Sequence, residues 1–136
     1  MTKVGVFAAI FDDKNRILLV KITYGSGNWT FPGEHLKENE SPIDGVKREV
    51  LEETGYVVDV EHLISVYSDP SKDDLVLLFK CRIVGQVGVH DNEIEQVEFF
   101  EKDKLPTQIH PWNIKRINDV YENKVSNIWF FEDIKI

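Results

Sequence analysis

Residues 32–56 read PGEHLKENESPIDGVKREVLEETGY, and they carry the strongest structural signal in the chain. Ser41 is a good helix N-cap, Pro42 fits the first helical turn, and Asp44 completes a Ser-x-x-Asp capping pattern. Gly55 suits the left-handed residue that commonly closes a helix. The stretch therefore predicts a helix that begins after Ser41 and ends at Gly55.

The predicted helix has an apolar face and an acidic face. Four apolar residues recur at helical spacing and are expected to form a buried stripe: Ile43, Val46, Val50 and Leu51. Glu49, Glu52 and Glu53 lie three and four positions apart, so they share another face. On an exposed helix such like-charge pairs cost only about 0.2–0.5 kcal/mol each, and Arg48 is placed to pair with Glu52. Charge alone therefore leaves two interpretations equally open, a solvated face and a functional cluster.

The order of these residues resembles a known family motif. The Nudix hydrolase signature, G-x5-E-x7-R-E-U-x-E-E-x-G-U with U a bulky apolar residue, is similar to this run: Glu40, Arg48-Glu49-Val50, Glu52-Glu53 and Gly55-Tyr56. From Glu40 onward every specified position is met, with the aromatic Tyr56 at the last apolar position. The resemblance implies an α/β fold, specifically a Nudix-type α/β/α sandwich with a mixed sheet between helices.

The front of the motif departs from the family pattern. The usual Pro-Gly-Gly is Pro32-Gly33-Glu34 here, so Glu34 stands where the family has its first glycine. Lys37 replaces a common glutamate and Asn39 replaces a glycine, a mild change because Asn tolerates left-handed geometry. Glu34 is the serious departure. Three outcomes stay open: its backbone carbonyl faces a metal, its carboxylate becomes an added ligand, or it obstructs the site.

Carboxylates crowded into a cleft need protons or cations. Two of them about 4 Å apart at an effective dielectric of ~20 repel by roughly 4 kcal/mol. Hard oxygen ligands suit Mg²⁺ or Mn²⁺. The resemblance implies a metal site built from Glu52 and Glu53, joined by Glu49 or Glu40. It also makes Glu49 a candidate general base, as a glutamate near the metals could accept a proton from water.

The resemblance implies catalytic roles for two more residues. Arg48 is expected to orient the glutamates rather than to bind substrate. Glu93 precedes a late strand, where family members often place one more carboxylate, so it stays in contention as the base. An ordinary acidic edge residue is an equally good interpretation of Glu93.

Three residues are predicted to contact substrate, each with a plainer interpretation beside it. Lys21 ends an apolar strand, where its cation either meets phosphate or is simply solvated. His35 lies in the loop before the helix, and Glu34 occupies the altered motif position. His110 and Trp112 open a late helix and could line a base or sugar pocket, although packing is the simpler interpretation.

Length and composition limit the classes of protein to which this chain could belong. The chain has 136 residues, which favours one domain over residues 1–136. Its formal net charge of −8 argues against a sequence-independent grip on long nucleic acids, but a small phosphorylated nucleotide can still bind through divalent cations. No apolar run approaches a membrane span, and the single cysteine, Cys81, is expected to be a reduced core residue. These features predict a cytoplasmic protein, with a homodimer left open.

The rest of the chain reads as strands and a second helix, which indicates a mixed α/β domain. The continuous apolar run at 17–20 is typical of a strand covered on both faces. The loop at 68–73, which contains Pro70, is a candidate for substrate selection. The predicted elements are strands at 3–11, 16–23, 57–67, 75–84, 97–100 and 127–134, and a helix at 111–123 that packs through Trp112, Ile117, Val120 and Tyr121.

These residues predict a divalent-metal-dependent Nudix pyrophosphohydrolase. Its expected substrate is a nucleoside diphosphate linked to another group, such as a nucleoside triphosphate or a nucleotide sugar. The alternative is a non-catalytic, nucleotide-binding regulatory Nudix domain, which the departures at Glu34 and Lys37 favour. A plain structural domain with an acidic helix leaves the ordered motif unexplained.

Overall fold

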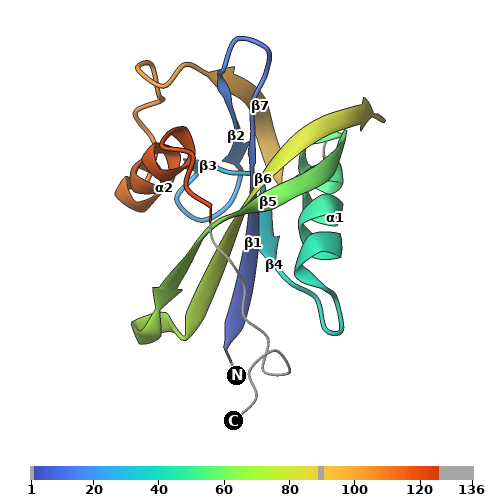
Figure 1. Cartoon of the computed structure of the whole chain (residues 1–136), viewed down its shortest axis with the longest axis vertical. Coiled ribbons are helices and arrows are strands. Elements are labelled where there is room, and N and C mark those ends of the chain that lie inside the picture. The colour runs from blue at the N-terminus through green and yellow to red at the C-terminus, as the bar shows by residue number, and fades with distance from the viewer. Residues whose placement is uncertain (1, 89–90, 126–136) are drawn as a thin grey trace.

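Two helices lie on opposite sides of a layer of strands (Figure 1). The computed structural model describes residues 2–88 and 91–125, and the predicted strand at 127–134 lies outside them. The elements in chain order are β1 (Lys3–Ile10), β2 (Ile17–Ile22), β3 (Trp29–Thr30), β4 (Gly33–His35), α1 (Pro42–Thr54), β5 (Tyr56–Asp69), the 3-10 helix η1 (Pro70–Lys72), β6 (Asp74–Gln86), β7 (Ile94–Phe100) and α2 (Pro111–Tyr121). This arrangement confirms the expected α/β sandwich.

The strands form two sheets. The larger has the order β4-β1-β6-β5, in which β1 runs parallel to β6 and antiparallel to β4, so it is the expected mixed sheet. The smaller sheet is antiparallel, with the order β3-β2-β7. Strands β3 and β4 were not predicted, because two or three residues are too short to display an alternating pattern. The pairing of β4 with β1 sets Glu34 opposite Val6.

Two apolar clusters hold the layers together. The first joins α1 to the large sheet through Val46 and Val50, and the second includes Ile117 and Val120 of α2. Cys81 is buried in the first cluster as a free thiol, which agrees with its expected place in the core. Burial of apolar area on both sides of the strands supplies the main stabilisation of this arrangement.

Strand β2 contributes to both clusters. Leu18 lies in the cluster beneath α1, whereas Ile17 and Leu19 lie in the cluster beneath α2. All three side chains are fully buried. The continuous apolar run is therefore explained as a strand that is covered on both faces, as predicted.

Helix α1 begins and ends as the sequence predicts. The Ser41 Oγ accepts a hydrogen bond from the Asp44 N–H at 3.2 Å. Gly55 adopts a φ of 78° and donates its N–H to the Leu51 carbonyl at 2.9 Å. The signature residues thus sit on a helix that is capped at both ends.

The predicted packing stripe of α1 is half wrong. Val46 and Val50 are buried, but Ile43 is 49% exposed and Leu51 is 39% exposed. The inward-facing residues are instead Gly45, Val46, Glu49, Val50, Glu53 and Thr54. The helix therefore turns part of its acidic face inward, and apolar periodicity alone does not reveal this because the buried polar positions break the pattern.

Helix α2 packs through Ile117 and Val120, but the prediction for Trp112 is wrong. Trp112 is 53% exposed and does not belong to the second cluster. Its place is the wall of a cleft, described below. No helix in the described part of the chain is long and apolar enough to cross a membrane.

Candidate active site

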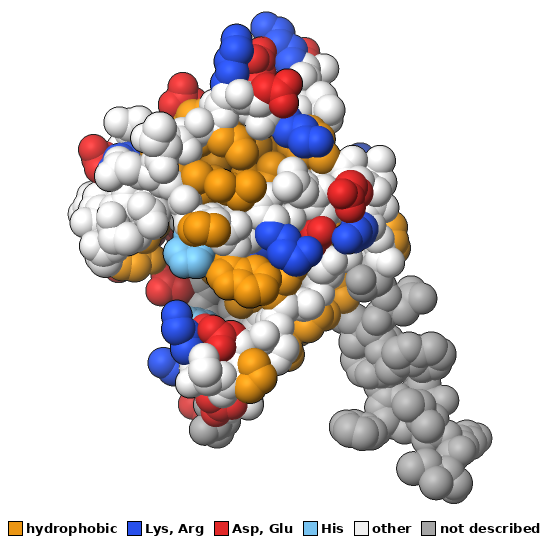
Figure 2. Space-filling model, turned by 90° about the vertical axis from the view of Figure 1, so that its left-hand side faces the viewer, with side chains coloured by type: hydrophobic (Ala, Val, Ile, Leu, Met, Phe, Trp, Pro, Cys, Tyr) orange, Lys and Arg blue, Asp and Glu red, His pale blue; other side chains and the backbone are white. Residues whose placement is uncertain are grey.

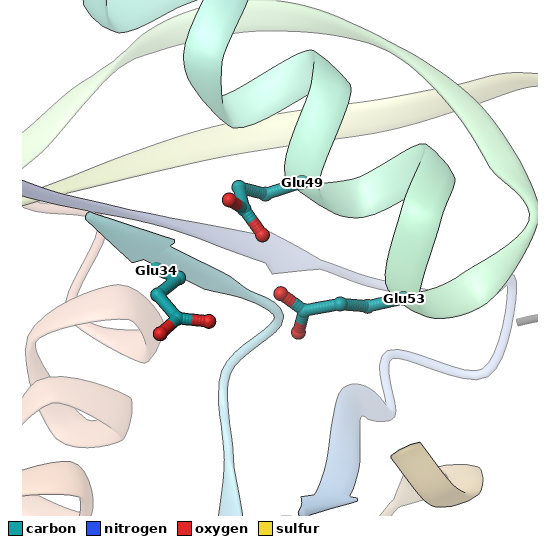
Figure 3. A group of neighbouring side chains, drawn as sticks. All are labelled: Glu34, Glu49 and Glu53. Carbon is teal, nitrogen blue, oxygen red and sulfur yellow. The ribbon is translucent and has the colours of Figure 1, made fainter. Parts of the chain in front are cut away.

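Three carboxylates converge where β4 faces α1 (Figure 3). Glu34 comes from β4, and Glu49 and Glu53 come from successive turns of α1. One oxygen of each residue lies within 4.8 Å of the other two. Glu49 and Glu53 are each only 7% exposed, so the cluster is partly interior. This part of the acidic helix face is therefore not solvated surface.

Gly33 positions the chain beside this cluster. Its φ is 146°, and an added Cβ would lie 2.1 Å from the Val6 carbonyl oxygen, so only glycine fits there. The Gly33 N–H donates to Glu53 Oε1 at 3.2 Å. Glu34 has no positive φ, whereas Asn39 adopts a φ of 61° as its tolerance of left-handed geometry predicts. The backbone geometry that needs glycine therefore falls one residue before Glu34.

The cluster is short of positive charge. Burial raises the pKa of Glu53 to about 10, and a hydrogen bond with Glu49 acts in the same direction. Burial also raises the pKa of Glu34, together with the nearby charges of Glu49 and Glu93. Such a group takes up either protons or a cation. Its hard carboxylate oxygens are the donors that Mg²⁺ and Mn²⁺ prefer, so the residues present fit a divalent ion.

Arg48 forms hydrogen bonds with three glutamates of the signature. Its Nε and Nη2 donate to the two oxygens of Glu40 at 2.6 Å and 2.9 Å. Its Nη1 donates to Glu49 Oε1 at 2.8 Å and to Glu52 Oε2 at 3.1 Å. Hydrogen bonding to Arg48 lowers the pKa of Glu40 to about 2. Arg48 thus contacts three signature glutamates, and its orienting role stays a prediction.

The four predicted metal ligands fall into two groups. Glu49 and Glu53 belong to the converging cluster, whereas Glu40 and Glu52 contact Arg48 and are not among the three carboxylates within 4.8 Å. Glu40 also accepts the Lys37 N–H at 3.1 Å, so both of its oxygens have partners. The carboxylate that joins the cluster instead is Glu34.

Glu93 lies in the turn before β7, and the turn is anchored on two sides. The Thr23 N–H and hydroxyl donate to the Glu93 carbonyl oxygen at 3.0 Å and 3.2 Å. The Asp91 N–H donates to the Glu52 carbonyl at 2.9 Å, at the end of α1. The Glu93 charge contributes to the raised pKa of Glu34. Its carboxylate is thus near the cluster, and its catalytic role stays a prediction.

The Lys21 amine has partners outside the three carboxylates. Its Nζ donates to the Gly27 carbonyl at 2.9 Å and pairs with Glu95 at 3.5 Å. A contact with substrate phosphate would require the amine to leave these partners. The substrate-binding role of Lys21 therefore stays a prediction without direct support from its position.

A cleft extends from the cluster toward α2. It consists of two hollows of about 350 Å³ and 430 Å³ that share Phe7, His35, His110 and Asn113. Glu34 lines the smaller hollow, which therefore adjoins the carboxylate cluster. Figure 2 shows the side of the molecule that carries α2 and η1, where hydrophobic side chains gather around a histidine and charged groups surround them.

His35 and Trp112 both line the larger hollow. The His35 Nε2 lies 3.2 Å from Asp74 Oδ1, and its predicted contact with substrate stays a prediction. His110 has a structural role as well, because its Nδ1 accepts the Trp112 N–H at 3.1 Å and caps α2. The exposed Trp112 ring is thus held at the cleft by the start of α2.

Sequence reasoning missed Arg116. Its guanidinium carbon lies 4.9 Å from the centre of the Tyr67 ring, and its Nη1 donates to Asn113 Oδ1 at 3.1 Å. Its Nε is buried and has no hydrogen-bond partner within residues 2–88 and 91–125. The signal that could have found it is the four-residue spacing from Trp112, which places both on one side of a helix.

The 3-10 helix η1 and the end of β5 complete the larger hollow through Ser68, Asp69 and Lys72. This segment is the loop at 68–73 for which substrate selection was predicted. It lies at the opposite end of the cleft from the three carboxylates, since none of its residues lines the smaller hollow. Its role in selection stays a prediction.

Comparisons with known proteins identify the family of this chain. A model of the NUDIX domain matches residues 1–120. A MutT-like protein of Streptomyces ambofaciens is 32% identical over 102 residues, which cover 75% of this chain and 66% of that protein. An ADP-ribose pyrophosphatase of Methanocaldococcus jannaschii is 30% identical over 103 residues, covering 71% of this chain and 61% of that protein. The chain thus spans about two thirds or less of the length of these relatives.

A solved structure extends the likeness to the whole fold. The crystal structure of an ADP-ribose pyrophosphatase from Streptococcus suis superposes with a TM-score of 0.78 at 25% identity, covering 96% of this chain and 97% of that one. The helix with its ordered glutamates, the mixed sheet beneath it and the matched region of 120 residues agree with one another. The chain therefore belongs to the Nudix domain family.

Proposed function

We propose that this protein hydrolyses the pyrophosphate bond of a nucleoside diphosphate linked to another group, with divalent metal ions bound at the carboxylate cluster. The observation that carries this proposal is the convergence of Glu49 and Glu53 with Glu34 beside an open cleft. Mg²⁺ usually binds proteins through a few carboxylates together with substrate phosphates, so such a cluster and a pyrophosphate complete one site. The names of the relatives, among them ADP-ribose pyrophosphatases, support the same substrate class.

The chain's own residues have distinct tasks in this reaction. Bound divalent ions would polarise the phosphoryl oxygens, activate a water and stabilise the leaving phosphate. Arg48 keeps Glu49 in place through a 2.8 Å hydrogen bond, which limits the rotamers that the carboxylate can adopt. Glu49 in the cluster and Glu93 beside it are the two candidate proton acceptors for the attacking water. Arg48 is thus a positioning residue.

The cleft suggests where the rest of the substrate lies. If the pyrophosphate lies at Glu34, the group attached to it extends past Phe7 and His110 toward Trp112 and Arg116. An exposed indole ring offers a stacking surface to a base, and a guanidinium offers donors to ring nitrogen, carbonyl or hydroxyl acceptors. We therefore place the base or sugar of the substrate in the larger hollow.

Two further properties belong to this proposal. Residues 1–136 are proposed to act as one domain, since the family match and both core clusters span most of the chain. The cytoplasm is proposed as its location, because the single cysteine is buried and unpaired.

The proposal is tested with a substrate panel. The purified protein is incubated with Mg²⁺ or Mn²⁺ and with nucleoside triphosphates, nucleotide sugars, ADP-ribose and dinucleotides, and the nucleotide products are separated by chromatography. We expect metal-dependent cleavage within the pyrophosphate of at least one compound, and none with a chelator present. Tight nucleotide binding without turnover of any compound would instead support the regulatory alternative and overturn this proposal.

A further inference from the structure

Glu34 has no lysine or arginine partner among the residues that the structure describes, whereas Glu40, Glu49 and Glu52 each pair with Arg48. Arg48 pairs with Glu40 at 2.6 Å and with Glu52 at 3.1 Å, but no lysine or arginine in the described part of the chain forms an ion pair with Glu34. Its polar neighbour is the Tyr24 hydroxyl, at 3.5 Å from Oε2, which is at the limit of a hydrogen bond. The Glu34 carboxylate is therefore held near two other carboxylates without local neutralisation.

The position of Glu34 follows from the sheet and does not depend on an unusual backbone. Residue 34 pairs with Val6 of β1 and has no positive φ, so a glutamate is accommodated without strain. Gly33 takes the one conformation that only glycine allows. Because β4 is hydrogen-bonded to β1, the Glu34 side chain projects from a rigid strand toward α1 (Figure 3).

We propose that Glu34 supplies an additional carboxylate ligand to the divalent ion that Glu49 and Glu53 hold, an inference that rests on the metal site of the proposed function. The three oxygens within 4.8 Å come from two separate elements, β4 and α1, so one ion bridges the strand and the helix. The resemblance assigns a glycine to position 34, which has no carboxylate. A side-chain ligand at this position is therefore a property of this chain.

The added ligand has a consequence for the order of binding. Three carboxylates carry more negative charge than one divalent ion neutralises, so the protein can hold an ion firmly before any phosphate arrives. A site with one carboxylate fewer depends more on substrate oxygens to complete the coordination. Glu34 therefore favours an enzyme that is loaded with metal in the absence of substrate.

The test measures Mn²⁺ binding to the metal-free protein without substrate, by titration calorimetry and by the loss of the free Mn²⁺ electron paramagnetic resonance signal. Glu34→Gln keeps the shape of the side chain and removes its charge, and Glu34→Gly restores the residue of the family motif. We expect both variants to bind the first ion at least roughly tenfold more weakly than the unmodified protein. Circular dichroism checks that each variant is folded.

Two controls separate the possible results. Glu38→Gln removes the same charge from an exposed loop residue and should leave the affinity unchanged, which excludes a general charge effect. Glu53→Gln should abolish tight binding, which establishes that the ion lies in this cluster. Unchanged affinity in both Glu34 variants, with binding lost in Glu53→Gln, overturns the role of Glu34 alone. Unchanged affinity in all of them would overturn the metal site of the proposed function as well.

Discussion

The two ends of the cleft are built on different principles. At the acidic end, Glu34, Glu49 and Glu53 bring like charges together, and two of the three are buried. At the aromatic end, Trp112 is largely exposed and Arg116 lies over a tyrosine ring with a buried Nε that has no partner in the described residues. The acidic end lacks positive charge, whereas the aromatic end has one buried donor without a partner in the described residues.

Under the proposed function, the acidic end carries the chemistry and the aromatic end binds the rest of the substrate. At the acidic end two of the three carboxylates come from one helix, and Arg48 contacts only Glu49 among them. The aromatic end gathers residues from α2, β5 and η1, segments that are distant in sequence. A change at the acidic end should therefore reduce the rate, whereas a change at the aromatic end should mainly alter substrate affinity.

The largest effect is expected for Glu53→Gln at the acidic end. The substitution removes a proposed metal ligand and keeps the side-chain volume, so Mg²⁺-dependent kcat should fall about 10³-fold or more while the circular dichroism spectrum is unchanged. Steady-state kinetics on the best substrate of the panel measures the effect. Near-normal turnover in this folded variant would remove Glu53 from the mechanism.

The same variant also tests how the Glu53 carboxyl affects the pH dependence of stability in the metal-free protein. Folding raises the pKa of Glu53 from 4.5 to about 10, so between these values the folded state holds a proton that the unfolded chain releases. The resulting stabilisation is complete below pH 4.5 and is lost as the pH rises toward 10. Thermal unfolding with a chelator present should show a melting temperature that declines over this window, and the decline should be smaller in Glu53→Gln. An equal decline in both proteins would show that Glu53 is not the group responsible.

Arg48→Lys should have an intermediate effect. Lysine keeps the charge but cannot bond both oxygens of Glu40 while also holding Glu49. We expect kcat to fall roughly 10- to 100-fold, as for residues that orient metal ligands, and the free energy of unfolding to fall by about 1–3 kcal/mol. Kinetics and urea unfolding give the two values.

The matched control is Arg82→Lys. Arg82 makes a 3.4 Å pair with Asp59 on the surface, and such pairs contribute about 0–1 kcal/mol. If both lysine variants behave alike, Arg48 is an ordinary surface cation and does not organise the site.

The smallest effect on the chemical step is expected at the aromatic end. Arg116→Gln removes donors from the larger hollow, so KM should rise roughly tenfold while kcat stays within about threefold. Lys115→Gln is the control, because Lys115 is the exposed neighbour on α2 that does not line the hollow. A fall in kcat with KM unchanged would contradict the separation between the two ends.

Local sequence signals were sufficient for the helix and for the family to which the chain belongs. The cap at Ser41, the stop at Gly55 and the spacing from Arg48 to Glu53 depend on neighbours within one or two turns, so they can be read without a fold. The apolar run of β2 likewise predicted a strand with both faces covered, which the two clusters explain. These features concern short-range geometry, which a single segment encodes.

The partnerships between segments could not be read in this way. The spacing of the glutamates does not reveal that Glu34 approaches Glu49 and Glu53 while Glu40 and Glu52 bind Arg48, because this depends on the pairing of β4 with β1. The exposure of Trp112, the position of Arg116 and the extent of the cleft depend in the same way on how α2 packs. Helical and strand periods describe which residues share a face, whereas long-range packing decides what that face meets.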